Sequence, residues 1–117
     1  MRKDNSVANK TKGLYTSFQM KTLEQISKIL REHRDELLTK FNVKSMAIFG
    51  SYARGDNTPT SDVDMIVELS QPMGWEIVDL HEYLREILGM EVDLVTKGAV
   101  SRKKILWKSI QEELVNV

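Results

Sequence analysis

Cysteine is absent from this chain of 117 residues, which also contains only two prolines and few aromatic residues. Without cysteine there are no disulfide bonds, no thiolate nucleophile and no cysteine-based zinc site. No apolar run is long enough to cross a bilayer, and the first residues lack the apolar stretch of a signal peptide. We therefore expect a cytoplasmic protein that does not bind membranes.

An excess of charge of one sign is also missing, because 17 Lys and Arg residues balance 17 Asp and Glu residues. Direct nucleic-acid binding through general electrostatic attraction is therefore not expected. The charges are nevertheless unevenly distributed. Residues 22–96 contain 14 acidic and seven basic side chains, whereas residues 97–108 contain five basic side chains and no acidic one. The acidic region suits divalent cations, and the basic segment is consistent with an acidic partner, a phosphate group or solvent exposure.

The length and the 41% hydrophobic content fit one globular domain. Residues 1–19 are polar and show no periodicity, which predicts a flexible N-terminal arm before a domain covering residues 20–117. The apolar spacing predicts a helix from Thr22 to about 42, strands at 44–49, 62–69 and 91–95, a helix ending at Gly89, a basic helix near 101–108 and a short strand at 113–117. Trp75 and Trp107 are expected to anchor helices. This order predicts the α/β class, with a small mixed β-sheet flanked by helices.

Two aspartates open an otherwise apolar strand. Successive side chains of a strand point to opposite faces, so Asp62 and Asp64 share one face. Two carboxylates at this spacing repel each other and are costly to bury, and a bound divalent cation removes that cost. Asp93 lies in a second apolar strand and can join the same cluster. Because carboxylates favour hard cations, Mg²⁺ is the expected metal.

A Gly-Ser turn supplies a place for phosphates. The pattern of residues 45–49 predicts a buried strand that ends at Gly50, and a short helix is expected to begin at Ser51. Glycine lets a ligand approach the backbone closely, and free N–H groups at the start of a helix attract anions. The Ser51 hydroxyl and the neighbouring amides are therefore candidates for holding a triphosphate.

The predicted topology brings both features together. A strand–helix–strand connection makes the strands at 62–69 and 91–95 parallel, so their three aspartates lie at the same end of the sheet. If the strand before Gly50 is antiparallel to its neighbour, the turn reaches that end too. Each residue also has a purely structural interpretation: a carboxylate can face solvent, a serine can cap a helix and a glycine can shape a turn. Arg54 is explained almost equally well by a surface salt bridge and by contact with a phosphate or a partner.

The pattern resembles the minimal nucleotidyltransferase (MNT) domains, which are small relatives of the DNA polymerase beta superfamily. The shared signature consists of Gly50-Ser51, Ala53-Arg54-Gly55, Ser61-Asp62-x-Asp64 and Asp93. The resemblance covers most of the chain, from about Met20 onward, and implies the polymerase beta-like nucleotidyltransferase fold.

The resemblance also implies the roles of the site residues in transferring a nucleoside monophosphate from a triphosphate to a hydroxyl group. Asp62 and Asp64 would ligate two Mg²⁺ ions. Asp93 would complete the ion beside the acceptor and take the acceptor's proton, which makes all three aspartates catalytic and metal-binding. Gly50, Ser51 and Arg54 would bind the nucleotide.

Within this family, the chain resembles the MntA-type antitoxins of HEPN/MNT toxin–antitoxin pairs. The resemblance implies transfer of AMP from ATP to a tyrosine of a HEPN RNase toxin. This leading hypothesis predicts a HEPN-type partner within a homo- or hetero-oligomer. Larger nucleotidyltransferases use a second domain to grip the acceptor, and this chain has no residues for one. Two alternatives remain: an enzyme that modifies a small molecule, like the aminoglycoside nucleotidyltransferases, and a binding-only antitoxin or inactive subunit.

Overall fold

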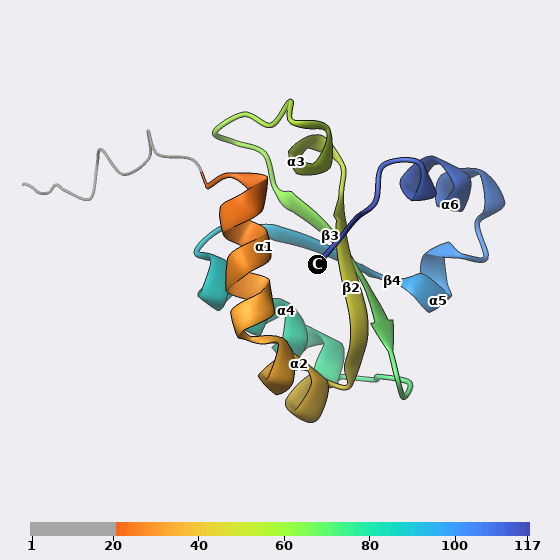
Figure 1. Ribbon diagram of the computed structural model, residues 1–117. Coiled ribbons are helices and arrows are strands. Elements are labelled where there is room, and N and C mark those ends of the chain that lie inside the picture. Colours follow the sequence, from red (N-terminus) through yellow and green to blue (C-terminus); the bar gives the residue numbers. More distant parts are fainter. Residues whose placement is uncertain (1–20) are drawn as a thin grey trace, which may run out of the picture.

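The computed structural model describes residues 21–117, so the arm predicted for residues 1–19 lies outside the described residues. The described chain folds into a mixed β-sheet with helices on both faces (Figure 1). This arrangement confirms the predicted α/β class. None of the helices in residues 21–117 has the length and apolar character needed to cross a membrane.

The sheet contains four strands in the order β4-β3-β2-β5. Their bounds are Val43–Phe49 for β2, Val63–Leu69 for β3, Val92–Thr96 for β4 and Val115–Asn116 for β5. Strand β3 is parallel to β4, as the helical connection predicted. It is antiparallel to β2, which is the condition under which the turn after β2 reaches the same end of the sheet. The ends of β2, β3 and β4 that carry the signature residues therefore lie at one end of the sheet.

Three helices cover one face of the sheet: α1 (Leu23–Glu32), α2 (Arg34–Phe41) and α4 (Glu76–Leu88) (Figure 1). Their apolar stripes pack on the alternate strand residues that point to this face. Fully buried members of this core are Ile26, Leu30, Leu37, Ile48, Val63, Met65, Leu80, Leu84 and Leu88. This core fixes the strand register, because a slip of one residue would turn the apolar side chains to the opposite face.

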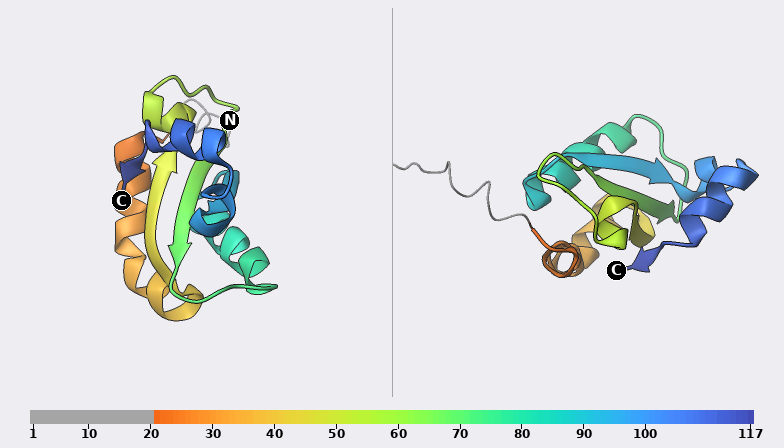
Figure 2. Two further views of the ribbon diagram at one scale, coloured as in Figure 1. Left: turned by 90° about the vertical axis from the view of Figure 1, so that its right-hand side faces the viewer. Right: turned by 90° about the horizontal axis from the view of Figure 1, so that it is seen from above.

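The opposite face is covered only in part, by the short helix α5 (Lys97–Val100) and by α6 (Lys104–Gln111). A smaller core forms here from Ala47, Ile66, Val100 and Ile110, with Phe49, Val95, Trp107 and Leu114 packed against it. Figure 2 shows α6 lying across the end of the sheet where the short helix α3 (Ser51–Arg54) follows β2. This end of the second face is where the signature residues meet.

The structure corrects three sequence-based expectations. The predicted first helix is interrupted at His33, whose backbone leaves helical geometry and whose ring Nδ1 lies 2.8 Å from the Ile29 carbonyl oxygen. Residues 97–100 form an additional helical turn, capped by the Thr96 hydroxyl, which accepts a hydrogen bond from the Ala99 amide. Trp75 does not anchor a helix, because 88% of its surface is exposed.

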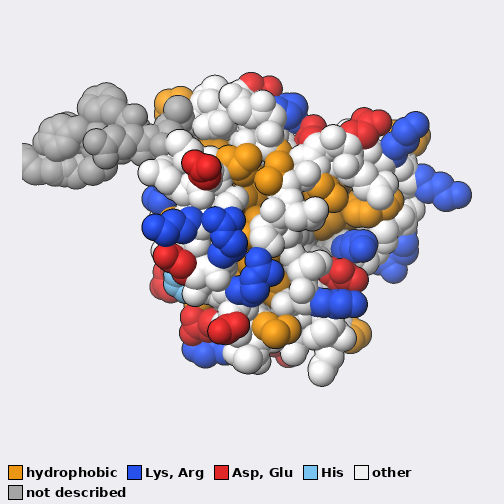
Figure 3. Space-filling model, viewed as in Figure 1, with side chains coloured by type: hydrophobic (Ala, Val, Ile, Leu, Met, Phe, Trp, Pro, Cys, Tyr) orange, Lys and Arg blue, Asp and Glu red, His pale blue; other side chains and the backbone are white. Residues whose placement is uncertain are grey.

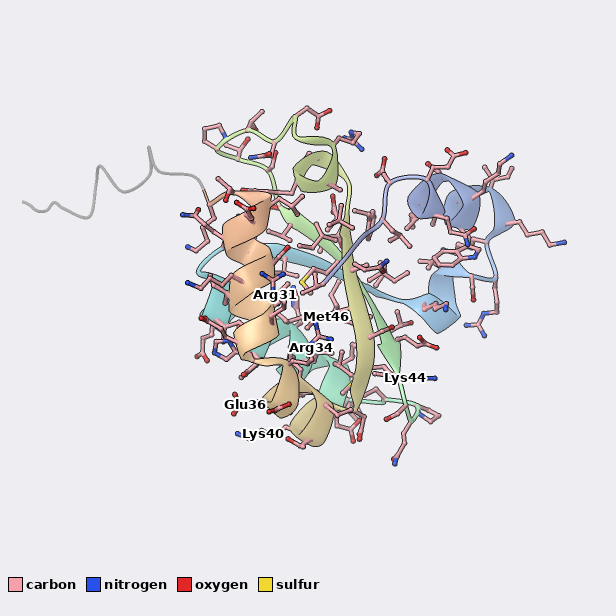
Figure 4. The ribbon with its side chains drawn as sticks, in the orientation of Figure 1. Arg31, Arg34, Glu36, Lys40, Lys44 and Met46 are labelled. Carbon is pink, nitrogen blue, oxygen red and sulfur yellow. The ribbon has the colours of Figure 1, made fainter. Side chains whose placement is uncertain are left out.

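The C-terminal end of the chain is attached to the helical layer. The Arg34 guanidinium of α2 donates a hydrogen bond of 2.8 Å to the Val117 carbonyl oxygen. Figure 4 shows the Arg34 side chain projecting from its helix beside Met46 of β2, and the Val117 amide bonds the Met46 carbonyl at 3.2 Å. These contacts hold the segment that follows α6 along the edge of β2.

Candidate functional site

Three neighbouring strands place one residue each in a row across the sheet. Asp64 of β3 pairs in register with Phe49 of β2 on one side and with Asp93 of β4 on the other. All three positions alternate with residues of the larger core, so their side chains lie on the face that carries α5 and α6. The predicted convergence of Asp64, Asp93 and the end of β2 is therefore present in the fold.

Asp64 is the most perturbed carboxylate of the site. Partial burial, the negative charge of Asp93, a hydrogen bond with the Asp93 side chain and the charge of Asp62 together raise its pKa from 3.8 to about 6. Arg54 acts in the opposite direction and lowers this pKa. Asp64 therefore holds its proton to a higher pH than an isolated aspartate does, which is how a partly buried carboxylate responds to nearby like charges.

Asp62 lies just before β3 and is exposed to solvent. In the described part of the chain, no three Asp, Glu or His side chains gather closely enough to enclose a metal ion. The structure thus brings Asp64 and Asp93 into contact and leaves Asp62 at the strand start, where it acts on Asp64 through its charge.

Gly50 separates β2 from α3 and lies against the Asp64 carboxylate. Its φ of 75° and ψ of −151° belong to a region that is essentially restricted to glycine. A Cβ atom at this position would lie 2.0 Å from Asp64 Oδ2. The turn and the carboxylate are therefore in direct contact, and Gly50 is required both for the backbone conformation and for the space.

Arg54 ends α3 beside this turn. Its guanidinium bonds Asp56 at 3.1 Å and Glu113 at 3.2 Å, and these two carboxylates raise its pKa further. The surface salt bridge that was one of the two alternatives for Arg54 is thus present, and Arg54 also lowers the pKa of Asp64. Ser51, the first residue of α3, is half-buried at the start of this helix.

Glu113 joins the site although its sequence position gave no indication of it. One of its carboxylate oxygens accepts a hydrogen bond of 2.8 Å from the Gly50 amide, and the same side chain pairs with Arg54. An amide and a guanidinium are the donors that a phosphate group would use. The Glu113 carboxylate therefore demonstrates that this turn accommodates an anion.

The donor set fits a divalent cation with a phosphate ligand. Asp64 and Asp93 provide hard oxygen ligands whose mutual repulsion a cation would relieve, as the raised pKa of Asp64 indicates. Gly50 leaves room beside Asp64 where any other residue would place a side chain. The amide of Gly50 and the guanidinium of Arg54 add anion-binding donors next to the acidic pair. This combination supports phosphoryl-group chemistry at one edge of the sheet.

A family model described as a nucleotidyltransferase domain matches residues 30–116. A protein of Methanocaldococcus jannaschii whose name assigns it as a protein adenylyltransferase is 48% identical over 101 residues, which cover 84% of this chain and 100% of the relative. The protein adenylyltransferase MntA of Thermococcus cleftensis is 40% identical over 99 residues, which cover 84% of this chain and 98% of the relative.

Solved structures share the fold. A structure described as a minimal nucleotidyltransferase has a TM-score of 0.68 at 24% identity, over 83% of this chain and 97% of that chain. A toxin–antitoxin complex with AMP-PNP has a TM-score of 0.61 at 24% identity, covering 78% and 70% of the two chains. A complex of a tri-AMPylated Shewanella oneidensis HEPN toxin with an MNT antitoxin has a TM-score of 0.54 at 22% identity, covering 78% and 66%.

Proposed function

This chain belongs to the nucleotidyltransferase domain family, and we propose that it transfers AMP from ATP to a hydroxyl group of a protein partner. The observation that carries the proposal is the contact of Asp64 with both Asp93 and the Gly50 turn. It combines an acidic pair with an anion-binding turn on one open face of the sheet. Nucleotidyl transfer needs both, because the triphosphate and its cations must be held together.

Asp62, Asp64 and Asp93 are the residues that would hold Mg²⁺. When bound, two such ions stabilise the charge that develops on the attacking and leaving oxygens of an in-line displacement. The Gly50 amide, the Ser51 hydroxyl and the Arg54 guanidinium would orient the β- and γ-phosphates. For this purpose Arg54 and the Gly50 amide must exchange their contact with Glu113 for a phosphate oxygen.

Asp93 is exposed at the outer strand of the sheet and is the group best placed to receive a proton from the acceptor. In the proposed step the acceptor oxygen forms a bond with the α-phosphorus of ATP. The bond from that phosphorus to the oxygen bridging the α- and β-phosphates breaks, and pyrophosphate leaves. The acceptor's proton passes to Asp93, which releases it to solvent before the next turnover.

The relatives support a protein as the acceptor. Proteins that share up to 48% of their residues with this chain, over nearly their whole length, carry the name protein adenylyltransferase. The fold is also that of an MNT antitoxin in complex with an AMPylated HEPN toxin. We therefore propose that this chain is an antitoxin, that its partner is a HEPN-type toxin, and that the modified group is a tyrosine hydroxyl.

ATP should bind much more weakly when no divalent cation is present. Without one, the charges of Asp62, Asp64 and Asp93 repel the triphosphate, so we expect its affinity to fall by at least about tenfold, which corresponds to about 1.4 kcal/mol. Titration calorimetry with Mg²⁺, with Mn²⁺ and with EDTA measures this difference. Equal affinity in Mg²⁺ and in EDTA would show that the aspartates do not hold the cation.

A labelled-ATP assay tests the acceptor class. The protein is incubated with Mg²⁺ and ATP labelled at the α-phosphate, together with a HEPN-type toxin, with an aminoglycoside, or with no acceptor. We expect label on the toxin alone. Label on the aminoglycoside would instead favour the small-molecule enzyme, whereas toxin binding without any transfer would favour the binding-only antitoxin.

A further inference from the structure

Helix α6 presents large apolar side chains to solvent on its outer side. Ile105 is 89% exposed and Leu106 is 44% exposed. They line a shallow, open surface together with Lys103, Lys104 and Ser109. We call this region the α6 outer surface, and its members are Arg102, Lys103, Lys104, Ile105, Leu106 and Ser109. Within α6, Ile105, Leu106 and Ser109 follow helical spacing and therefore form one stripe, and Arg102 lies in the turn that precedes the helix.

The exposed residues are not needed to attach α6 to the sheet. The inner side of the helix already supplies Ile110, which is buried, and Trp107, which packs on the smaller core. Two apolar stripes on one helix of eight residues exceed what a single packing interface uses. The outer stripe is therefore available to a second interface, and exposed apolar groups with a polar rim commonly mark such contacts.

Basic side chains predominate beside the N-terminal part of this stripe. Residues 97–108 contain five basic side chains and no acidic one, Glu112 and Glu113 follow α6, and Figure 3 shows both basic and acidic side chains on this part of the molecule. Within residues 21–117, only Lys97 of this group has an acidic partner, Glu68 at 3.9 Å. Lys103, Lys104 and Lys108 have none there. An acidic partner would therefore gain attraction without displacing existing ion pairs.

The α6 outer surface is connected to the catalytic edge. Glu113 follows the end of α6 and accepts the hydrogen bond from the Gly50 amide. A partner seated on α6 would therefore bind the helix whose following segment reaches the turn that is proposed to hold the triphosphate.

We propose that the α6 outer surface docks an acidic, amphipathic helix of the protein that accepts AMP. Its apolar residues would cover Ile105 and Leu106, and its carboxylates would face Lys103 and Lys104. Burial of Ile105 and Leu106 distinguishes this occupant from RNA, because RNA phosphates would bind the lysines and leave Ile105 exposed. The proposal rests on the proposed function, because it names the docking site of that protein acceptor.

The first test separates apolar contact from general surface effects. In the variant Ile105→Ser with Leu106→Ser, we expect binding of the HEPN-type toxin, measured by calorimetry without ATP, to weaken by at least about tenfold. The affinity for Mg-ATP should stay unchanged, and circular dichroism should show an intact fold. The matched control is Leu38→Ser, because Leu38 is 48% exposed but belongs to α2 on the other face.

The second test uses charge. The change Lys103→Glu with Lys104→Glu should slow association with the toxin by about tenfold at low salt, and the difference should shrink at high salt. Lys28→Glu on α1, which is also exposed, is the control. Unchanged toxin binding in both α6 variants overturns the docking proposal. It is also overturned if these variants bind the toxin normally but no longer bind a single-stranded RNA probe. If toxin binding depends on α6 but no AMP is transferred, the docking site stands and the proposed chemistry fails.

Discussion

Replacing Asp64 by asparagine should lower AMP transfer by about 10²–10³-fold or more, the scale expected when a strong electrostatic contributor to a transition state is lost. Asp64 is the carboxylate that contacts both Asp93 and the Gly50 turn, so no neighbour can substitute for it. Initial rates of label transfer from ATP measure the effect. Glu86→Gln on the exposed side of α4 is the control for removing one negative charge, and it should leave the rate unchanged.

The same substitution should make the metal-free protein more stable at neutral pH. Folding raises the pKa of Asp64 from 3.8 to about 6, so the charge that this group carries above pH 6 destabilises the folded state. The rise of the pKa from 3.8 to about 6 corresponds to at most about 3 kcal/mol of unfolding free energy, and to less than this because Asp64 is only half-buried. Asparagine removes this cost and can still bond Asp93.

The sign of this effect predicts its pH dependence. Because the pKa of Asp64 is raised in the folded state, this group destabilises the wild type least below pH 4, where Asp64 is neutral in both the folded and the unfolded chain. That advantage is lost as the pH rises from about 4 through about 6. The melting temperature of Asp64→Asn should therefore exceed that of the wild type at pH 8 and match it near pH 4. Full transfer activity in a folded Asp64→Asn protein would contradict the assignment of Asp64.

Gly50→Ala should destabilise the fold and abolish measurable ATP binding. The new Cβ would lie 2.0 Å from Asp64 Oδ2, and the backbone conformation at Gly50 costs other residues about 1–3 kcal/mol. Relief of the clash would displace either the turn or the Asp64 carboxylate, and both belong to the proposed nucleotide site. We expect a loss of at least about 3 kcal/mol of unfolding free energy in urea titrations.

Gly55→Ala is the matched control for this prediction. Gly55 ends α3 with a φ of 83°, and a Cβ there would meet no atom within 4 Å. The unfolding free energy of this variant should fall by only about 1–2 kcal/mol, the cost of a left-handed backbone conformation, and the variant should still bind Mg-ATP. Similar losses of stability and of ATP affinity in the two variants would show that the contact between Gly50 and Asp64 has no special importance.

The sequence predicts the strands that carry the site because its signals there are local. Alternation places Asp62 and Asp64 on one face, and the helix between two apolar strands makes those strands parallel. The register that sets Asp64 beside Asp93 follows from the apolar residues around them. The predicted start of the first helix is also confirmed, since Thr22 caps α1 and its hydroxyl accepts a hydrogen bond from the Gln25 amide.

Other features depend on contacts that no local pattern encodes. Glu113 meets Gly50 across 63 positions of sequence, so only the folded chain shows that it occupies the anion-binding donors. The break at His33 is hidden because apolar spacing continues from Ile29 and Leu30 to Leu37 on either side of it. Trp75 carries no periodic signal that distinguishes an anchoring residue from an exposed one, and the structure leaves it at the surface.

Mass spectrometry of the protein partner tests the central claim most directly. A HEPN-type toxin is incubated with Mg-ATP and either the wild-type chain or Asp64→Asn, and the intact toxin and its tryptic peptides are then weighed. The account predicts toxin that carries one or more AMP groups, located on tyrosine, with the wild type and unmodified toxin with the variant. Unmodified toxin in both reactions, while the two proteins bind it equally well, would contradict the account and leave this chain a protein that only binds its partner.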